Sequence, residues 1–169
     1  GGSFTRAGPL RRAGLTAVSL TTGAPSARFN ASLPRFQYGP GRATVTALLS
    51  AAGRLYVGGL FTNPWILGNV AGGVRAISPS SGRPIRRFAA DYFFYGDEEF
   101  VVPQSLARSA ARLYVASAGL YPPGVAVLTL ATGRRVALLT DISATAVLAT
   151  PDRVYAAEGA AIRIFRGAP

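Results

Sequence analysis

The chain has 169 residues and a formal net charge of +11, because 18 arginines stand against seven acidic residues and lysine is absent. Its length fits a single domain, and its content of 49% hydrophobic and only 15% charged residues is typical of a folded protein rather than a disordered one. The sequence also contains no histidine and no cysteine. This excludes a Ser-His-Asp triad, a cysteine nucleophile, a disulfide framework and metal sites built on imidazole or thiolate ligands.

The arginines are scattered along the chain and are adjacent in pairs at most, at Arg11-Arg12, Arg86-Arg87 and Arg134-Arg135. Because no run of five or more basic residues occurs, the pattern favours an acidic protein or an anionic surface as the partner over nucleic acid. No apolar stretch approaches the roughly 18 residues of a membrane span. The opening Gly1–Thr5 has neither a start methionine nor a signal-peptide pattern, so we expect a processed N-terminus or a piece of a longer polypeptide.

The predicted elements form a repeating unit of four short strands, named A, B, C and D in chain order. The first unit, over residues 1–33, begins at strand B (residues 1–5), continues into an apolar strand C that ends at Thr22-Gly23, and lacks strand A. The second and third units, over residues 43–91 and 104–141, are complete, and the fourth, over residues 143–169, lacks strand D. The strands predicted for these three units are residues 43–50, 54–61, 74–78, 84–89, 104–108, 112–117, 125–130, 134–140, 143–149, 153–157 and 161–166.

Internal similarity supports this division. The segment Gly1–Thr5 returns as Gly58–Thr62, and Arg54–Val57 returns as Arg112–Val115 and, more loosely, as Arg153–Ala156. In strand B the tyrosine lies on the face opposite to its two neighbours. Such units, recurring at intervals of 41 to 59 residues, predict an all-β fold in the form of an incomplete β-propeller of about three and a half four-stranded antiparallel blades. Chance similarity within an ordinary β-sandwich is the alternative.

The motif Gly-Gly-x-Phe-Thr, followed by an apolar strand closed by Thr-Gly or Ser-Gly and by a strand ending in phenylalanine, resembles the delta-sixty class of β-propeller repeats. Residues 1–33 and 43–91 carry this resemblance best, whereas residues 104–169 keep the strand pattern but have Ala116-Ser117-Ala118 in place of the glycine signature. Such repeats occur in bacterial secreted and surface proteins. The resemblance therefore implies a propeller architecture and an extracellular or cell-surface location, without implying any catalytic motif.

Residues 1–169 are expected to form one segment of a larger ring, because closed propellers have four to eight blades. Strand B of the first unit lacks its inner neighbour, and strand C of the fourth unit lacks its outer one. Exposed strand edges are templates for pairing, and native proteins cover them. We therefore expect the missing strands to come from the remainder of a longer polypeptide, from another subunit or from a second copy of the chain.

We expect no catalysis, no cofactor and no resident metal, because the hydroxyl nucleophiles have no evident base. The one acidic cluster, Asp97-Glu98-Glu99, is a candidate for Ca²⁺ binding, but adjacent carboxylates do not converge on an ion, and a solvated loop or a salt-bridge patch is favoured. Asp152 falls in an A–B turn, where turn chemistry explains it. The tyrosines of strand B are expected to pack in the core or between blades; they are Tyr56, Tyr114 and Tyr155.

In up-and-down blades the A–B and C–D turns emerge at one edge, and the B–C and D–A loops emerge at the other. Here the A–B and C–D turns are short and plain, whereas the other loops are long and rich in aromatic and basic residues. We therefore expect binding at the B–C/D–A loop face, through Trp65, Phe36, Tyr38, Tyr92, Phe93, Tyr95, Tyr121, Arg11, Arg12 and Arg35.

The expected function is that of a non-catalytic protein-interaction or scaffold module in a secreted or surface assembly, with an acidic protein or a glycan as ligand. A propeller that binds a carbohydrate or another small ligand is the first alternative. A structural part of a larger secreted enzyme is the second.

Overall fold

The computed structural model describes residues 1–33, 43–62, 71–88, 90, 102–118, 124–139 and 142–166. These residues form twelve β-strands and no helix, which confirms the predicted all-β class. The strands are β1 (Arg6–Ala7), β2 (Leu10–Arg11), β3 (Thr44–Ala51), β4 (Arg54–Thr62), β5 (Ala71–Ile77), β6 (Val102–Ser109), β7 (Arg112–Ala118), β8 (Gly124–Thr129), β9 (Arg135–Leu139), β10 (Ala146–Ala149), β11 (Arg153–Glu158) and β12 (Ala161–Arg166).

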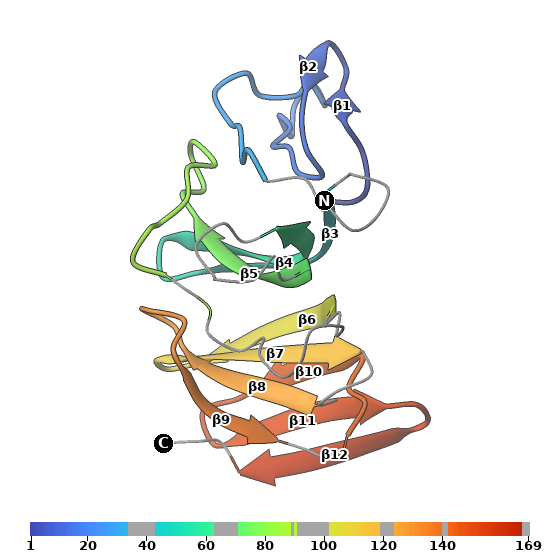
Figure 1. The fold of residues 1–169 in the computed structure, drawn as a ribbon, viewed down its shortest axis with the longest axis vertical. Helices are drawn as coiled ribbons and strands as arrows, with labels where there is room; N and C mark the ends of the chain where they lie inside the picture. Colours follow the sequence, from blue (N-terminus) through green and yellow to red (C-terminus); the bar gives the residue numbers. More distant parts are fainter. Residues whose placement is uncertain are drawn as a thin grey trace.

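The strands form four antiparallel sheets, and every pairing joins strands that are consecutive in the chain. The sheets are β1-β2, β3-β4-β5, β6-β7-β8-β9 and β10-β11-β12. They lie one above another in chain order, with the first unit at one end of the molecule and β10–β12 at the other (Figure 1). No described strand is shared between two sheets, so each sheet of three or four strands is an open antiparallel meander.

Hydrophobic cores separate the layers. The first lies between the first unit and β3–β5, the second between β3–β5 and β6–β9, and the third between β6–β9 and β10–β12. Buried side chains of the first core include Leu15, Phe29, Val57, Phe61 and Ile77. Because both faces of the two middle sheets are covered, most of the apolar surface of the chain is used between sheets.

Alternate side chains of strand β7 pack into two different cores. Leu113 and Val115 belong to the core shared with β3–β5, while Tyr114 belongs to the core shared with β10–β12. The adjacent strand β8 is buried from Gly124 to Leu128. Continuous burial of this kind is typical of a strand covered on both faces.

The predicted C–D turns have the same geometry in three units. In each, the amide of a glycine donates to the carbonyl oxygen of a Ser or Thr four residues earlier, at 2.8 Å. Each glycine also has a positive φ, between 69° and 78°, which a residue with a side chain adopts at a cost. The three pairs are Gly23 with Ser19, Gly82 with Ser78, and Gly133 with Thr129. The repeat inferred from residue identities is therefore also a repeat of backbone conformation.

The strand predicted over residues 84–89 is wrong. Only an isolated bridge between Ile77 and Pro84 is present, followed by a turn in which the amide of Phe88 donates to the carbonyl oxygen of Ile85 at 3.0 Å. The amide of Ile85 still donates to the carbonyl oxygen of Ala76 at 2.9 Å, and the turn from Ile85 to Phe88 then takes the chain away from β5, so pairing ends there. Phe88 is nevertheless buried in the core between β3–β5 and β6–β9.

Two further predicted strands differ from the structure. Residues 1–5 are not a regular strand, although their backbone pairs with residues 12–14, and the chain then forms the short hairpin β1–β2. The strand predicted over residues 143–149 begins only at Ala146, because the amide of Ser143 donates to Glu158 Oε1 at 2.9 Å instead of to a neighbouring strand.

Candidate functional site

Most of the residues predicted for the loop face lie outside the described residues. These are Arg35, Phe36, Tyr38, Trp65, Tyr92, Phe93, Tyr95 and Tyr121, together with the acidic cluster Asp97, Glu98 and Glu99. Of the predicted binding residues, the structure describes Arg11 and Arg12. The loop face as a whole therefore stays a prediction.

Arg12 is 8% exposed and serves the packing of the first unit. Its guanidinium donates to the carbonyl oxygens of Arg11 at 2.7 Å and Ser26 at 3.0 Å. Arg11 itself is exposed on β2 and keeps its place as a candidate. Arg75 is also buried, with its guanidinium carbon 5.7 Å from the centre of the Phe61 ring, and burial lowers its pKa. Neither buried arginine is available to a ligand.

The strand B tyrosines pack between sheets, as predicted, where a following sheet exists. Tyr56 and Tyr114 are almost completely buried. The Tyr56 hydroxyl donates to the carbonyl oxygen of Leu130 in the next sheet at 2.7 Å, and its ring meets that of Phe88 edge to face at 5.3 Å. Burial raises the pKa of Tyr56. Tyr155, in the last sheet, is only half-buried.

The outer face of β10–β12 carries an uncovered row of apolar side chains. Leu148, Tyr155 and Ile164 form one row across this sheet, because Leu148 pairs with Tyr155 and Tyr155 pairs with Ile164. Leu148 is 62% exposed and Ile164 is 56% exposed, and Ile162 beside them is 68% exposed. We call these four residues the end face.

The end face has a counterpart in each of the two preceding sheets. The same pairing positions are occupied there by two further rows, Leu49-Tyr56-Ala76 and Ala107-Tyr114-Val127. Both rows pack against the following sheet. The end face is therefore a third copy of a packing surface, and no sheet of the described residues covers it.

The A–B and C–D turns lie together along one edge of the stacked sheets, which is the left edge in Figure 1. We call this edge the turn rim. It comprises residues 19–25, 50–54, 78–84, 108–112, 129–135, 150–153 and 166. Arginine is the first residue of strand B in each sheet of three or four strands, at Arg54, Arg112 and Arg153. The turn rim carries eight arginines in all: Arg54, Arg83, Arg108, Arg112, Arg134, Arg135, Arg153 and Arg166.

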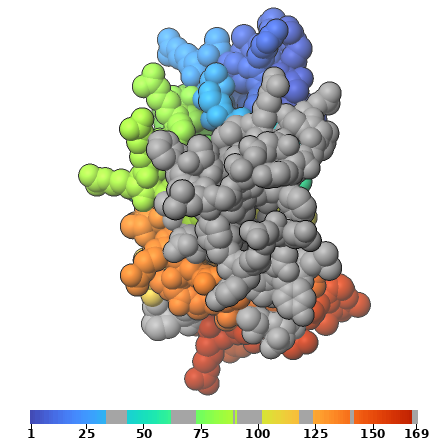
Figure 2. Space-filling model, in the orientation of Figure 1, coloured from blue at the N-terminus to red at the C-terminus, as the bar shows by residue number. Residues whose placement is uncertain are grey.

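The sequence analysis expected binding at the B–C and D–A loops and did not consider the arginines of the A–B and C–D turns as a group. A signal was present, because the RLYV and RVYA repeats align an arginine at the start of each strand B. In the same orientation as Figure 1, Figure 2 shows side chains of the segments 71–88 (green) and 124–139 (orange) projecting from this edge.

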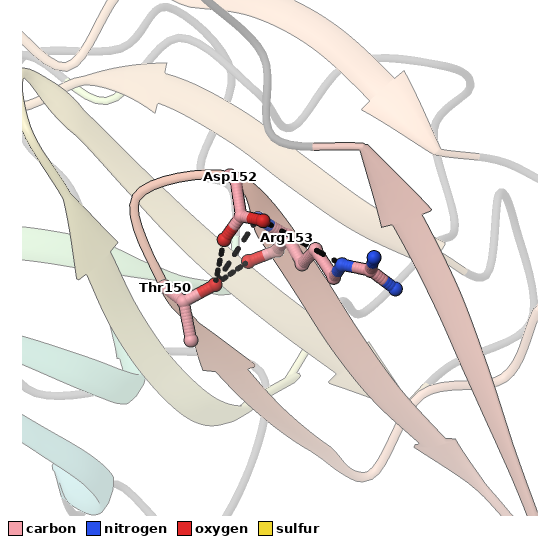
Figure 3. Close-up of polar contacts among 3 residues, drawn as sticks. All are labelled: Thr150, Asp152 and Arg153. Carbon is pink, nitrogen blue, oxygen red and sulfur yellow. Dashed lines mark hydrogen bonds and ion pairs between the residues drawn. The ribbon is translucent and has the colours of Figure 1, made fainter.

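The one acidic residue of the turn rim is held by local turn chemistry, as predicted (Figure 3). The Thr150 hydroxyl donates to Asp152 Oδ1 at 2.9 Å and accepts from the amide of Arg153 at 3.1 Å. The hydrogen bond from Thr150 lowers the pKa of Asp152, and Arg153, 3.6 Å away, acts in the same direction. Asp152 therefore stays ionised but neutralises only one of the neighbouring arginines.

Among the described residues, no group of three or more acidic side chains is placed to hold a metal ion. No helix long and apolar enough to cross a membrane is found in the same part of the chain. No protein-family model matches the sequence, and no curated protein matches it. The resemblance to delta-sixty repeats therefore stays a prediction.

Proposed function

We propose that the chain is a non-catalytic interaction module of the β-propeller type, about three and a half blades long, that assembles with a further β-sheet through its end face. The observation that carries this proposal is the row Leu148-Tyr155-Ile164, whose two counterparts are buried against a following sheet. Since a following β-sheet covers both counterparts, we expect the end face to bind a β-sheet as well. The partner is an apolar sheet of the same construction.

The end face would contribute apolar stabilisation to such a contact. Fully burying a Leu or Ile side chain contributes about 1.5–3 kcal/mol. Leu148, Ile162 and Ile164 are each more than half exposed, so covering them stabilises a contact by about 1–2 kcal/mol apiece. A sheet in this position can also offer a backbone carbonyl to the Tyr155 hydroxyl, as Leu130 does to Tyr56.

The opposite end of the molecule is uncovered in a corresponding way. Val18, in the first unit, is 53% exposed, whereas Ile77, at the same place before the C–D turn of β3–β5, is fully buried against the first unit. Further sheets between the two ends would continue the same stacking. This supports an incomplete propeller over an ordinary sandwich, and the resemblance to secreted and surface repeats supports an extracellular role.

The described carboxylates support a non-catalytic role. Asp152 is hydrogen-bonded to Thr150 in a turn, and Glu158 accepts from the amide of Ser143 and from Arg163 at 3.1 Å. Both are occupied in local contacts at the surface. The Thr150 hydroxyl beside Asp152 also accepts from the amide of Arg153 at 3.1 Å and so belongs to the same turn.

The test uses the whole chain, because its uncovered end face should associate when no partner sheet is supplied. Sedimentation velocity over a range of protein concentrations, together with binding of the dye ANS, should show self-association and an exposed apolar surface. The double variant Leu148→Glu with Ile164→Glu should reduce both signals. The matched control is Leu20→Glu with Val136→Glu, which changes two exposed apolar residues outside the end face and adds the same charge.

A wild-type chain that stays monomeric and does not bind the dye would contradict the proposal. Equal loss of association in the test and control variants would also contradict it, because added negative charge alone would then explain the result.

A further inference from the structure

The turn rim concentrates positive charge along one edge of the fold. Among the described residues it holds eight arginines and one aspartate, a formal charge of +7. Six of the arginines are exposed: Arg83, Arg108, Arg134, Arg135, Arg153 and Arg166. A charge of this size on one edge repels itself, so a compensating anion would be attracted strongly to it.

The arginines of the turn rim repeat from sheet to sheet. Arg54, Arg112 and Arg153 begin strand B in three successive layers, and Arg83 and Arg134 directly follow the C–D glycine in two of them. Stacked sheets lie about 10 Å apart. This spacing is close to the Debye length of about 8 Å at physiological ionic strength, so the potentials of neighbouring layers overlap along the edge.

One contact shows that the layers are joined at this edge. Arg54 Nη1 donates to the carbonyl oxygen of Ala131, in the C–D turn of the next sheet, at 2.8 Å. This contact joins the A–B turn of one sheet to the C–D turn of the next, so the turns that carry the arginines hold fixed positions along the stacking direction. A long, thin anion lying along this direction would meet guanidinium groups from three successive layers.

The residues between the arginines indicate which kind of polyanion fits. The turns of the rim contain no aromatic residue, and single-stranded nucleic acids depend on aromatic stacking for much of their affinity. They contain one large, fully exposed apolar residue, Leu20, which leaves little for the hot spot of a protein interface. Their other side chains are mostly small or hydroxylic, and the hydroxyls can bond to sugar hydroxyl, carboxylate and sulfate groups.

We propose that the turn rim binds an acidic polysaccharide, with the exposed arginines forming charge-assisted hydrogen bonds to its carboxylate or sulfate groups. Guanidinium groups suit this role because they present planar, paired donors to such anions. The rim is a different surface from the predicted loop face. It borders the end face at the last sheet, where Arg153 and Arg166 pair on the same face as Tyr155 and Ile164.

The experiment measures binding of the whole chain to immobilised heparin over a series of salt concentrations. The rim variant combines Arg83→Gln, Arg134→Gln and Arg153→Gln, one exposed arginine from each of three layers. It should bind at least about tenfold more weakly near physiological salt, and the slope of log affinity against log salt should fall by up to about 3, one for each lost contact.

The control variant combines Arg6→Gln, Arg28→Gln and Arg87→Gln, which are exposed, lie outside the rim and are not among the predicted loop-face residues. It has the same net charge as the rim variant, and it should retain heparin binding within about threefold. Melting curves of both variants should match that of the wild type. Equal weakening in the two variants would overturn the proposal, because net charge and not the rim would then govern binding.

Two further probes distinguish the class of polyanion. Oligothymidylate and poly-L-glutamate, each matched to the heparin chains in number of charges, should bind at least tenfold more weakly than heparin. Equal or tighter binding of either probe would overturn the assignment to a polysaccharide, as would failure of the wild-type chain to bind heparin at all.

Discussion

The hydrogen bond between Tyr56 and Leu130 offers a direct test of the stacked-sheet core. Replacing Tyr56 with Phe keeps the ring and its edge-to-face contact with Phe88 but removes the hydroxyl that donates to the Leu130 carbonyl at 2.7 Å. A buried neutral hydrogen bond contributes about 0.5–1.5 kcal/mol, and leaving its acceptor unpaired raises the cost toward 1–3 kcal/mol. We expect a loss of about 1–2 kcal/mol.

The assay is thermal unfolding followed by circular dichroism, supported by urea titration. For a chain of this length, 1 kcal/mol corresponds to about 2–4 °C in melting temperature, so Tyr56→Phe should lower it by about 2–8 °C. The control is Tyr155→Phe, at the same place in the last sheet, where the side chain is half-buried and no following sheet covers it. It should change stability by less than about 0.5 kcal/mol.

The dependence on pH gives a second, independent readout. Burial raises the pKa of Tyr56 above its ordinary value of 10.0, with Arg54 and Arg108 opposing this effect. The folded state therefore holds the phenol proton more tightly than the unfolded state does. The contribution of Tyr56 is complete below about pH 10 and is lost as the pH rises through the folded-state pKa. The stability advantage of the wild type over Tyr56→Phe should shrink above pH 10.

Equal melting temperatures for the wild type and Tyr56→Phe would refute this reasoning, as would equal effects of Tyr56→Phe and Tyr155→Phe. Either result would mean that the hydrogen bond from Tyr56 to Leu130 does not stabilise the packing of β3–β5 against β6–β9.

Two other expectations follow from local geometry. Gly23→Ala should lower the free energy of unfolding in urea by about 1 kcal/mol, because φ is +69° and the space around the glycine is open. Gly82→Ala should lower it clearly more, because the new Cβ would lie 2.6 Å from the Ala31 amide nitrogen. Equal losses for the two variants would exclude the steric explanation. The hydrogen bond from the Ser143 amide lowers the pKa of Glu158, so the stability that this carboxylate contributes is complete above about pH 4.5 and is lost as the pH falls through the folded-state pKa. The difference in melting temperature between the wild type and Glu158→Gln should therefore narrow on acidification below pH 4.5, and a constant difference would count against this account.

Strands whose signals are local could be predicted from the sequence. Strand B was located in three units because alternation around a central tyrosine and a preceding tight turn depend only on neighbouring residues. The C–D turns were found for the same reason, since a glycine with positive φ marks each of them. The strand predicted at 84–89 was wrong because the apolar pattern does not reveal the turn from Ile85 to Phe88, which takes the chain away from β5 after one bridge.

The predicted binding residues illustrate the limit of such reasoning. Arg12 and Arg11 are adjacent and look alike in the sequence, yet one is buried among backbone carbonyls and the other is exposed. Burial of a side chain depends on how the chain closes around it, and a pattern of neighbours does not contain that information.

The sequence by itself determined the all-β class, the repeating unit and the alternating faces of strand B, because these depend on side-chain periodicity and turn residues. Only the tertiary structure decided which copies of a repeated surface are covered: Tyr56 and Tyr114 are buried by a following sheet, and Tyr155 is not. It also decided that arginines far apart in the chain share one edge. Each antiparallel meander returns its A–B and C–D turns to the same side, and stacking of the sheets then aligns those sides into a single charged rim.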